Sequence, residues 1–504
     1  MPMQPRAPGA LLIVLAALLP AAALAAGNDW AGHLRADARH FHATVAEGHP
    51  GPVDPENPGF QARLDAALAT ALEKADRTRD VGGYWWALRE FQASFDDGHV
   101  QLASTDALPS LPTRWPGFLT RYDGLRHVVA ARDDGNDALP PRGAVLVACD
   151  GEAADALAER LVGRYRGRWM LESQRRSHGW RLFLDAGNPW EPLPRRCSFE
   201  VEGGAREFAL AWRDMEPGAF AARAAEVQPA VEASIGLREA RDGIAWVSLG
   251  SFDGDPSGAS HPQLTNVVAM LRARGEALRG RPVVLDLRGN GGGSSHWSVQ
   301  IAEALWGEAA VARARVSSEA VDWRVSEGNM AVVRDFRASL LASAGDAADP
   351  ALLGWADTIL AGLQAAHERG QVLWRQTGAD EDAEAEAEIE GTIAGAVPAA
   401  APPRVVVVTD SSCASACLDA MDLWMALGVL HVGRETAADT VYMEIRGEAL
   451  PSGLARIGIP MKAYRGRARG SNEPYRPGLA YEGNIADTAE LEAWIAERIL
   501  AVGR

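Results

Sequence analysis

Two short apolar segments in the C-terminal half of this chain each run into a turn of small residues and then into a helical pattern. Residues 282–287 lead into three consecutive glycines, Gly291 to Gly293, and residues 404–409 lead into a serine-rich turn at 411–415. From Gly243 onward strand and helix patterns alternate, which is typical of an α/β layer. The sequence therefore predicts an α/β domain in this half of the chain.

The remaining regions have different patterns. A chain of 504 residues is too long for one hydrophobic core, so we expect several domains. Residues 26–110 have apolar side chains at helical spacing, and prolines divide them into two helical parts. Residues 111–220 show short strands separated by turns, with one helix near 153–162. Residues 221–504 form the α/β part, with a helical and then acidic insertion at about 310–403.

Charge and composition exclude some classes of function. The formal net charge of −17 argues against binding to nucleic acid, which requires a concentrated basic face. Of the 50 basic residues only Lys74 and Lys462 are lysines. Because the guanidinium of arginine stays protonated, few basic side chains are available as a general base.

The N-terminus has the pattern of an export signal. Arg6 precedes an apolar stretch at 10–26, and Ala23-Leu24-Ala25 offers the small residues that a signal peptidase accepts. We expect residues 1–25 to be a cleaved signal peptide and the mature protein to be periplasmic or secreted. No later segment is apolar for long enough to span a membrane, so we expect no membrane span after the signal is removed.

Export permits disulfide bonds, and the chain has four cysteines. Burial of the four as small apolar side chains and the formation of one or two bridges are equally compatible with the sequence. For Cys413 and Cys417, which flank Ser415, we favour packing, since a bridge within one helical turn needs a particular geometry.

The two turns have the features of a site for acyl transfer. Glycine allows the backbone to turn sharply, and the start of the following helix leaves N–H groups free to bind an anion. Such a turn can form an oxyanion hole, although a tight turn without function is the alternative. In the second turn Ser415 lies among small residues at the start of a helix, where it could be a nucleophile or simply a helix cap.

Taken together, the segments resemble the tail-specific (C-terminal processing) proteases. The matching segments are Leu-Asp-Leu-Arg-Gly-Asn-Gly-Gly-Gly at 285–293, the Ser415-Ala416 turn and helix, Asp-Asp-Gly-His at 96–99, the strand and turn at 142–151, and Leu-Pro-Ser-Gly at 450–453. The resemblance implies a helical N-terminal domain (26–110), a PDZ-like domain (111–220) and a protease domain (221–504). It also implies that Ser415 is the nucleophile, and that Ala416 and one of Gly291, Gly292 and Gly293 supply the oxyanion hole.

The general base is where the sequence departs from this family. The processing proteases use a lysine as the general base, and the corresponding position in this sequence is occupied by about Asp439. Lys462 and His296 are the two alternatives, and histidine is better matched to proton transfer near neutral pH. Glu473 or Asp439 could orient the base. We expect His99 to tie the helices together, and no histidine group has the spacing of a metal site.

The expected function is therefore hydrolysis of peptide bonds in exported polypeptides through an acyl-enzyme on Ser415, with no cofactor. Two alternatives remain open at this stage. One is a catalytically inactive relative that binds peptides, because the family lysine is missing. The other is an esterase or small-peptide hydrolase that uses the same serine.

Overall fold

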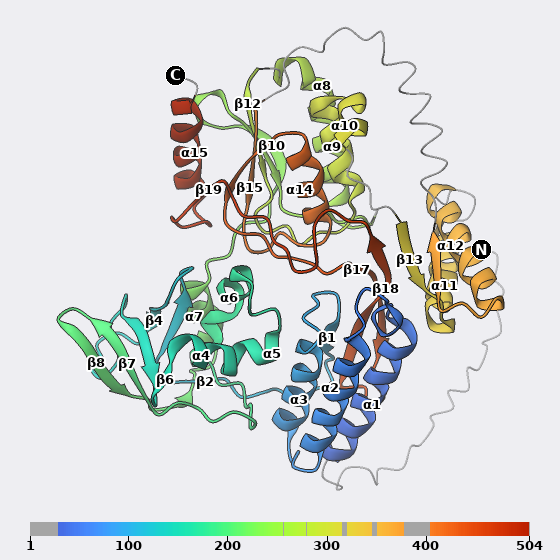
Figure 1. The fold of residues 1–504 in the computed structure, drawn as a ribbon. Coiled ribbons are helices and arrows are strands. Elements are labelled where there is room, and N and C mark those ends of the chain that lie inside the picture. The colour runs from blue at the N-terminus through green and yellow to red at the C-terminus, as the bar shows by residue number, and fades with distance from the viewer. Residues whose placement is uncertain are drawn as a thin grey trace, which may run out of the picture.

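The computed structural model describes residues 29–255, 257–278, 280–314, 320–344, 350–376 and 404–502. The predicted signal peptide and the acidic run at 380–386 lie outside the described residues. Helices and sheets are mixed in several packed parts, so the predicted fold class is confirmed (Figure 1). Within the described ranges, no helix is both long and apolar enough to cross a bilayer.

A six-stranded sheet forms the centre of the α/β part. Its strands lie in the order β10, β11, β12, β15, β16 and β19, and only β10 runs antiparallel to its neighbour. The bounds are β10 Ile235–Glu239, β11 Ala245–Leu249, β12 Pro282–Asp286, β15 Arg404–Thr409, β16 Leu430–Gly433 and β19 Leu479–Ala480.

Helices cover both faces of this sheet. On one face Val283, Leu285 and Val407 pack against α8 (His261–Leu278), α9 (His296–Trp306) and α14 (Ala416–Ala426). On the other face Val284 and Val406 pack against α15 (Thr488–Val502), and Figure 1 shows α15 alone on that side of the strands. Burial on both faces explains why β12 and β15 are continuous apolar runs rather than alternating ones.

The N-terminal helices share a core with a hairpin from the far end of the chain. Helices α1 (Trp30–Gly48), α2 (Phe60–Ala75) and α3 (Val81–Ala93) pack on strands β17 (Tyr442–Ala449) and β18 (Ala455–Arg465). Strand β1 (Gln101–Ser104) pairs antiparallel with β18. This contact places the segment after α3 next to the α/β part, and Figure 1 shows β1 beside β18.

The strand-rich region lies to one side of the N-terminal helices. Its sheet has the order β3, β4, β5, β7 and β8, with the short β6 against β5. The bounds are β3 Phe118–Tyr122, β4 His127–Arg132, β5 Val145–Cys149, β6 Glu152–Ala153, β7 Arg196–Val201 and β8 Gly204–Ala209. A separate pair joins β2 (Arg114–Trp115) to β9 (Arg213–Asp214).

Short helices accompany this sheet. They are α4 Ala154–Ala158, the π-helix η2 Glu159–Gly163, α5 Arg164–Arg166, α6 Glu172–His178, the 3-10 helix η3 Gly179–Phe183 and α7 Ala219–Val227. The short strands predicted for residues 111–220 are present, and α4 and η2 form the helix predicted near 153–162.

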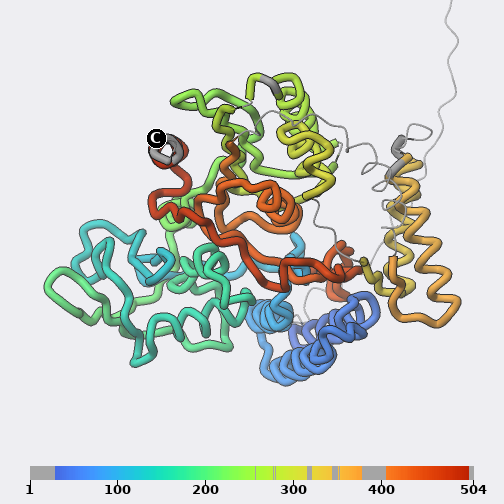
Figure 2. Tube along the Cα trace, turned by 45° about the horizontal axis from the view of Figure 1, so that its top comes forward, coloured from blue at the N-terminus to red at the C-terminus, as the bar shows by residue number. Residues whose placement is uncertain are grey.

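The insertion contributes strands as well as the expected helices. Helices α11 (Glu327–Ala344) and α12 (Pro350–Glu368) are flanked by β13 (Ala320–Arg324) and β14 (Leu373–Gln376). Strand β13 pairs antiparallel with β18 and extends its sheet. Figure 2 shows α11 and α12 projecting from the body of the molecule.

Candidate active site

Three loops meet at one edge of the central sheet. The parallel strands β12, β15 and β16 end at Asp286, Thr409 and Gly433, and each continues into a loop: 287–295, 410–415 and 434–440. Because the carboxyl ends of parallel strands share an edge, these loops lie together. The glycine turn, the serine turn and the segment containing Asp439 are therefore neighbours.

Ser415 has a strained backbone at the start of α14. Its φ of 55° and ψ of −125° place it in a region that residues other than glycine rarely adopt. The Ser415 N–H donates a hydrogen bond of 2.7 Å to the Asp439 carboxylate, which holds the turn. The side chain is half-buried, and its hydroxyl makes no hydrogen bond to any residue that the structure describes. A serine on a sharp strand-to-helix turn is the arrangement expected of an exposed nucleophile.

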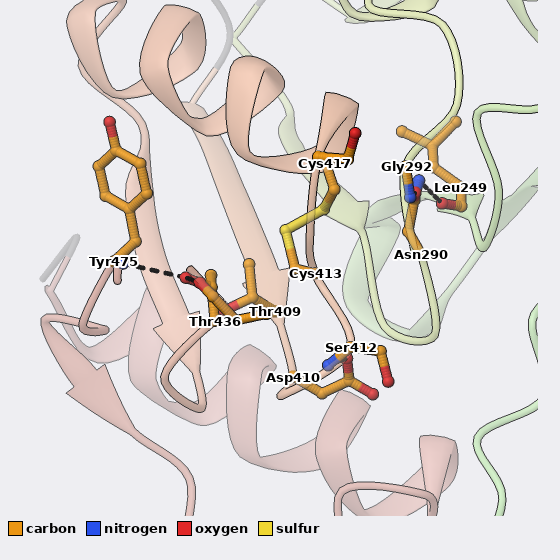
Figure 3. The surroundings of a disulfide bond; sticks show 12 residues. Leu249, Asn290, Gly292, Thr409, Asp410, Ser412, Cys413, Cys417, Thr436 and Tyr475 are labelled. Carbon is orange, nitrogen blue, oxygen red and sulfur yellow. Dashed lines mark hydrogen bonds between the residues drawn. A yellow bond between two sulfur atoms is a disulfide. The ribbon is translucent and has the colours of Figure 1, made fainter. Parts of the chain in front are cut away.

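The glycine turn is held against Ser415 by buried polar groups. Asn290 is fully buried; its side-chain amide donates to the Leu249 carbonyl at 2.7 Å, and its side-chain oxygen accepts the Gly292 N–H at 2.8 Å (Figure 3). Asp410 accepts from the N–H groups of both Gly289 and Ser412, so it joins the two turns. Burial raises the pKa of Asp410, although these N–H groups oppose the shift.

Gly292 is in direct contact with the serine turn. Its φ is +102°, and a Cβ placed there would lie 2.7 Å from the Ala414 carbonyl oxygen and 2.7 Å from the Ser415 Cβ. Any other residue would displace one of the two turns. The position therefore requires glycine for both its conformation and its close approach.

The turns leave backbone donors free beside Ser415. Ala416 is the first residue of α14, and its N–H makes no hydrogen bond within the described part of the chain. The same holds for the N–H groups of Gly291 and Gly293, whereas Gly292 N–H is occupied by Asn290. Free N–H groups at a helix start are suited to stabilise an oxyanion. Of the three glycines, Gly291 and Gly293 have the free N–H groups that such a site requires.

A disulfide bond closes the serine turn. Cys413 and Cys417 are bridged, with Cα atoms 5.3 Å apart, and both are fully buried (Figure 3). The preference for simple packing of this pair was wrong, because the turn brings Cys413 beside the first turn of α14. The bridge encloses Ser415 and constrains the segment that adopts the strained conformation.

Both candidate bases from the sequence have side-chain partners of their own. His296 is exposed at the start of α9, and its ring contacts the side chains of Gln300 and Trp297. Lys462 lies on β18, where its ammonium group pairs with Glu444 at 3.2 Å and packs over the Trp323 ring. Burial lowers the pKa of Lys462, but Tyr464 and Glu444 raise it by more, so the net shift is upward. A lysine base requires the opposite shift.

The two candidate orienting carboxylates differ in position. Asp439 is buried and bonded to Ser415 N–H. Glu473 is exposed, and its carboxylate accepts from Gly470 N–H at 2.8 Å. The neighbouring Asn472 donates its N–H to the Asp439 carbonyl and its side-chain amide to the Asp96 carbonyl. Asn472 therefore connects the loop at 96–99 with the loop that holds Ser415.

This connection identifies His99 as a candidate that the sequence analysis set aside. Thr440, next to Asp439, donates its hydroxyl to the Asp97 carboxylate at 2.9 Å. Asp97 also accepts the His99 N–H and lies 3.8 Å from His99 Nδ1. His99 is 6% exposed, and Nδ1 has no hydrogen-bond partner among the described residues. The Asp-Asp-Gly-His pattern was visible, but its position beside the serine loop depends on long-range packing.

The other charged groups of the turns are structural. Arg288 is buried and bonded twice to Asp286, to the Ile485 carbonyl and to Thr488, so it fixes α15 to the sheet. No cluster of three metal-ligating side chains occurs in the described part of the chain.

No protein-family model matches the sequence, and no curated protein matches it. Solved structures do match. Mature CPAF in complex with lactacystin aligns with 94% of this chain and 98% of its own, at 14% identity and a TM-score of 0.56. The chain has the fold of CPAF. Mature CPAF alone gives a TM-score of 0.55 at 14% identity, over 92% of this chain and 96% of its own.

A putative S41 protease from Bacteroides fragilis also aligns, with 92% of this chain and 97% of its own, at 14% identity and a TM-score of 0.33. The resemblance to tail-specific proteases that the sequence indicated is thus confirmed at the level of the fold by the CPAF matches. The roles of individual residues follow only from the geometry above.

Proposed function

We propose that the chain is a serine peptidase that hydrolyses exported polypeptides through an acyl-enzyme on Ser415. The observation that carries the proposal is the strained turn that presents the Ser415 hydroxyl beside free backbone donors. Attack by the hydroxyl on a peptide carbonyl would place the developing negative charge near Ala416 N–H and a glycine N–H. Water would then release the acyl group and restore Ser415.

His99 is the general base in this proposal. Its imidazole would accept the Ser415 proton during attack and donate it to the departing amine. The Asp97 carboxylate, 3.8 Å from His99 Nδ1, would stabilise the imidazolium. Burial raises the pKa of Asp97, but contacts with His49 and His99 lower it by more, so Asp97 stays ionised at neutral pH. Asp439 would act on the backbone of Ser415 rather than on its proton.

Hydrolysis of a labelled unfolded protein tests this assignment. We expect Ser415→Ala to lower kcat by about 10⁴-fold or more, since the covalent route is lost. Ser412→Ala is the matched control, because Ser412 is an exposed serine of the same turn. Robust cleavage by Ser415→Ala would exclude Ser415 as the nucleophile.

The replacement of the family lysine by Asp439 favours one competing function, a peptide-binding protein without activity. In that case neither wild type nor Ser415→Ala cleaves protein, while both bind an unfolded polypeptide equally. Hydrolysis of short esters without cleavage of protein would instead indicate an esterase that uses the same serine.

Export is part of the proposal. Two disulfides, Cys149–Cys197 and Cys413–Cys417, are features of proteins in oxidising compartments. Fractionation of cells that express the full chain tests this step. We expect the processed protein outside the cytoplasm, and retention of the unprocessed chain inside would contradict export.

A further inference from the structure

A basic cavity lies between the N-terminal helices and the strand-rich region. Its volume is about 310 Å³, and its walls come from α3, from residues 97, 98 and 100–103, and from α5, α6 and the segment between them. The basic side chains in its lining are Arg89, Arg166, Arg168 and His178. Figure 1 shows α3 and α5 facing each other across this boundary.

The cavity has positive charge without matching negative charge. None of these four side chains forms an ion pair with any residue that the structure describes. Asp97 is the one acid of the lining, and its carboxylate is engaged by Thr440 and by the His99 N–H. The four side chains are half-buried, and cations that are partly removed from water usually have a paired anion, because removal of charge from water is costly.

Polar atoms around the cavity also lack partners. Arg89 Nε and His178 Nδ1 are buried without a hydrogen bond among the described residues. Gln92 is 8% exposed; its side-chain nitrogen donates to the Val100 carbonyl, but its oxygen is unpartnered. Gln174 is 7% exposed, and its side chain has no hydrogen bond within the described ranges. Of these groups, the Arg89 Nε–H and the Gln174 amide are donors that a bound anion would satisfy.

The pKa values of the basic side chains Arg89, Arg166 and His178 are all lowered. Burial, and then the charge of the adjacent Arg181, lower the pKa of Arg89 to about 10. Burial and the charges of Arg89 and Arg181 lower the pKa of Arg166 well below its usual value. The pKa of His178 is lowered by burial and by four surrounding arginines. An anion in the cavity would offset each of these shifts.

We propose that this cavity binds an oxoanion, a carboxylate or a phosphate group, between Arg89, Arg166 and His178. Guanidinium groups present paired N–H donors that match two oxygens of such a group. The Arg166 guanidinium makes no hydrogen bond to any described residue, so all its donors are available. The Gln174 amide supplies a further N–H donor from the wall.

The cavity is connected to the loop at 434–440, in which Asp439 binds the Ser415 N–H. The Arg168 guanidinium lies against Gly98 and donates to the Ala438 carbonyl at 2.5 Å, next to Asp439. The oxoanion could be free in solution or be a carboxylate of a polypeptide substrate. The second source rests on the proposed peptidase function, whereas binding of a free anion does not.

The test measures phosphate binding by calorimetry and by thermal shift, with chloride at equal ionic strength as reference. It uses the full chain carrying Ser415→Ala, so no turnover is needed. We expect Arg166→Gln to bind phosphate about 10- to 100-fold more weakly, as for loss of charged hydrogen bonds. The matched control is Arg164→Gln, because Arg164 lies on the same short helix but pairs with Glu90 and Glu191 outside the cavity.

Folding of each variant is checked by its melting temperature without phosphate, and Arg89→Gln serves as a second variant if Arg166→Gln does not fold. Equal phosphate binding by wild type, Arg166→Gln and Arg89→Gln would overturn the proposal, as would the absence of any binding by wild type. A peptide with a free C-terminal carboxylate is then compared with its amidated form. Competition with phosphate by the free acid alone supports a substrate carboxylate, and no competition by either peptide supports a free anion.

Discussion

The turn around Ser415 and the hairpin around Lys462 lie in the same half of the chain but use their polar groups in opposite ways. At Ser415 the backbone is strained, the hydroxyl is unbonded and neighbouring N–H groups have no partners among the described residues. At Lys462 the charge is paired with Glu444 and the ammonium group packs over aromatic rings. Strain and unsatisfied donors that persist in a folded protein point to function, whereas satisfied charges point to stability.

The largest effect expected after loss of Ser415 itself comes from His99. His99→Gln removes the proposed base and leaves the side-chain volume similar, so we expect kcat to fall by about 10³-fold, within the range for general-base catalysis. The matched control is His296→Gln, since His296 is exposed and, among the described residues, its ring contacts Gln300 and Trp297 of its own helix. The rates of protein hydrolysis by the two purified variants show whether His99 or His296 is the general base. A large loss for His296→Gln together with an active His99→Gln would reverse the assignment.

The sequence could predict each turn but not the hydrogen bonds that link the loop at 96–99 to Thr440 and Asn472, beside Asp439. The strands at 282–287 and 404–409, the glycine turn and the helix after Ser415 are local patterns within 10 to 20 residues. The loop at 96–99 lies next to the loop at 434–440 because α1 to α3 pack on β17 and β18, more than 300 residues later in the chain. Such packing leaves no local periodicity, so the sequence predicted only that His99 ties the helices together.

Lys462 is a second residue whose surroundings could not be predicted from the sequence. It lies on β18 at Ala455–Arg465. Its partners, however, come from two other strands: Glu444 on β17 and Trp323 on β13. Only three-dimensional pairing shows that the charge is already neutralised, and so the sequence alone kept Lys462 as a possible base.

The next largest effect is expected at Gly292, where the glycine turn contacts the serine turn. It shows whether this close approach is needed for catalysis. Gly292→Ala would place a Cβ 2.7 Å from the Ser415 Cβ at a φ of +102°, so the turns must separate. We expect kcat to fall by about 10²-fold, the size of the loss of one oxyanion donor, because separation of the turns moves Ser415 away from the free N–H groups of Gly291 and Gly293, with a smaller change in KM. Gly291→Ala is the control in the same turn, because nothing lies within 4 Å of its added Cβ. Equal losses for the two variants would contradict a specific role of the Gly292 contact.

Loss of either disulfide is expected to have a smaller effect on kcat than the changes above, and the two disulfides should differ in what they stabilise. Cys149–Cys197 closes 48 residues within the strand-rich sheet, whereas Cys413–Cys417 closes four around Ser415. By loop-closure entropy, replacement of the first pair by alanines should lower the free energy of unfolding by about 4 kcal/mol, and of the second by about 2 kcal/mol. We expect only the second replacement to lower kcat, by about 10-fold, because it releases the strained turn.

Denaturant unfolding and kcat per folded molecule, measured on both double variants, check this contrast. A reduced kcat in the Cys149→Ala/Cys197→Ala variant at a temperature where it is fully folded would mean that the strand-rich region affects the chemistry directly. Unchanged kcat in the Cys413→Ala/Cys417→Ala variant would show that Asp439 alone suffices to hold Ser415.

The smallest effect on catalysis is expected at Lys462. Lys462→Met removes the ion pair with Glu444 and the contacts with aromatic rings, so the free energy of unfolding should fall by about 1 kcal/mol while kcat stays unchanged. Because the folded-state pKa of Lys462 is raised, its contribution is present below the unfolded value of 10.5 and is lost as the pH rises through the folded value. The stability difference between wild type and Lys462→Met should therefore be constant from pH 7 to 9 and shrink above about pH 10.5. A loss of kcat near that of His99→Gln would instead place Lys462 in the chemistry and remove the contrast between the hairpin and the serine turn.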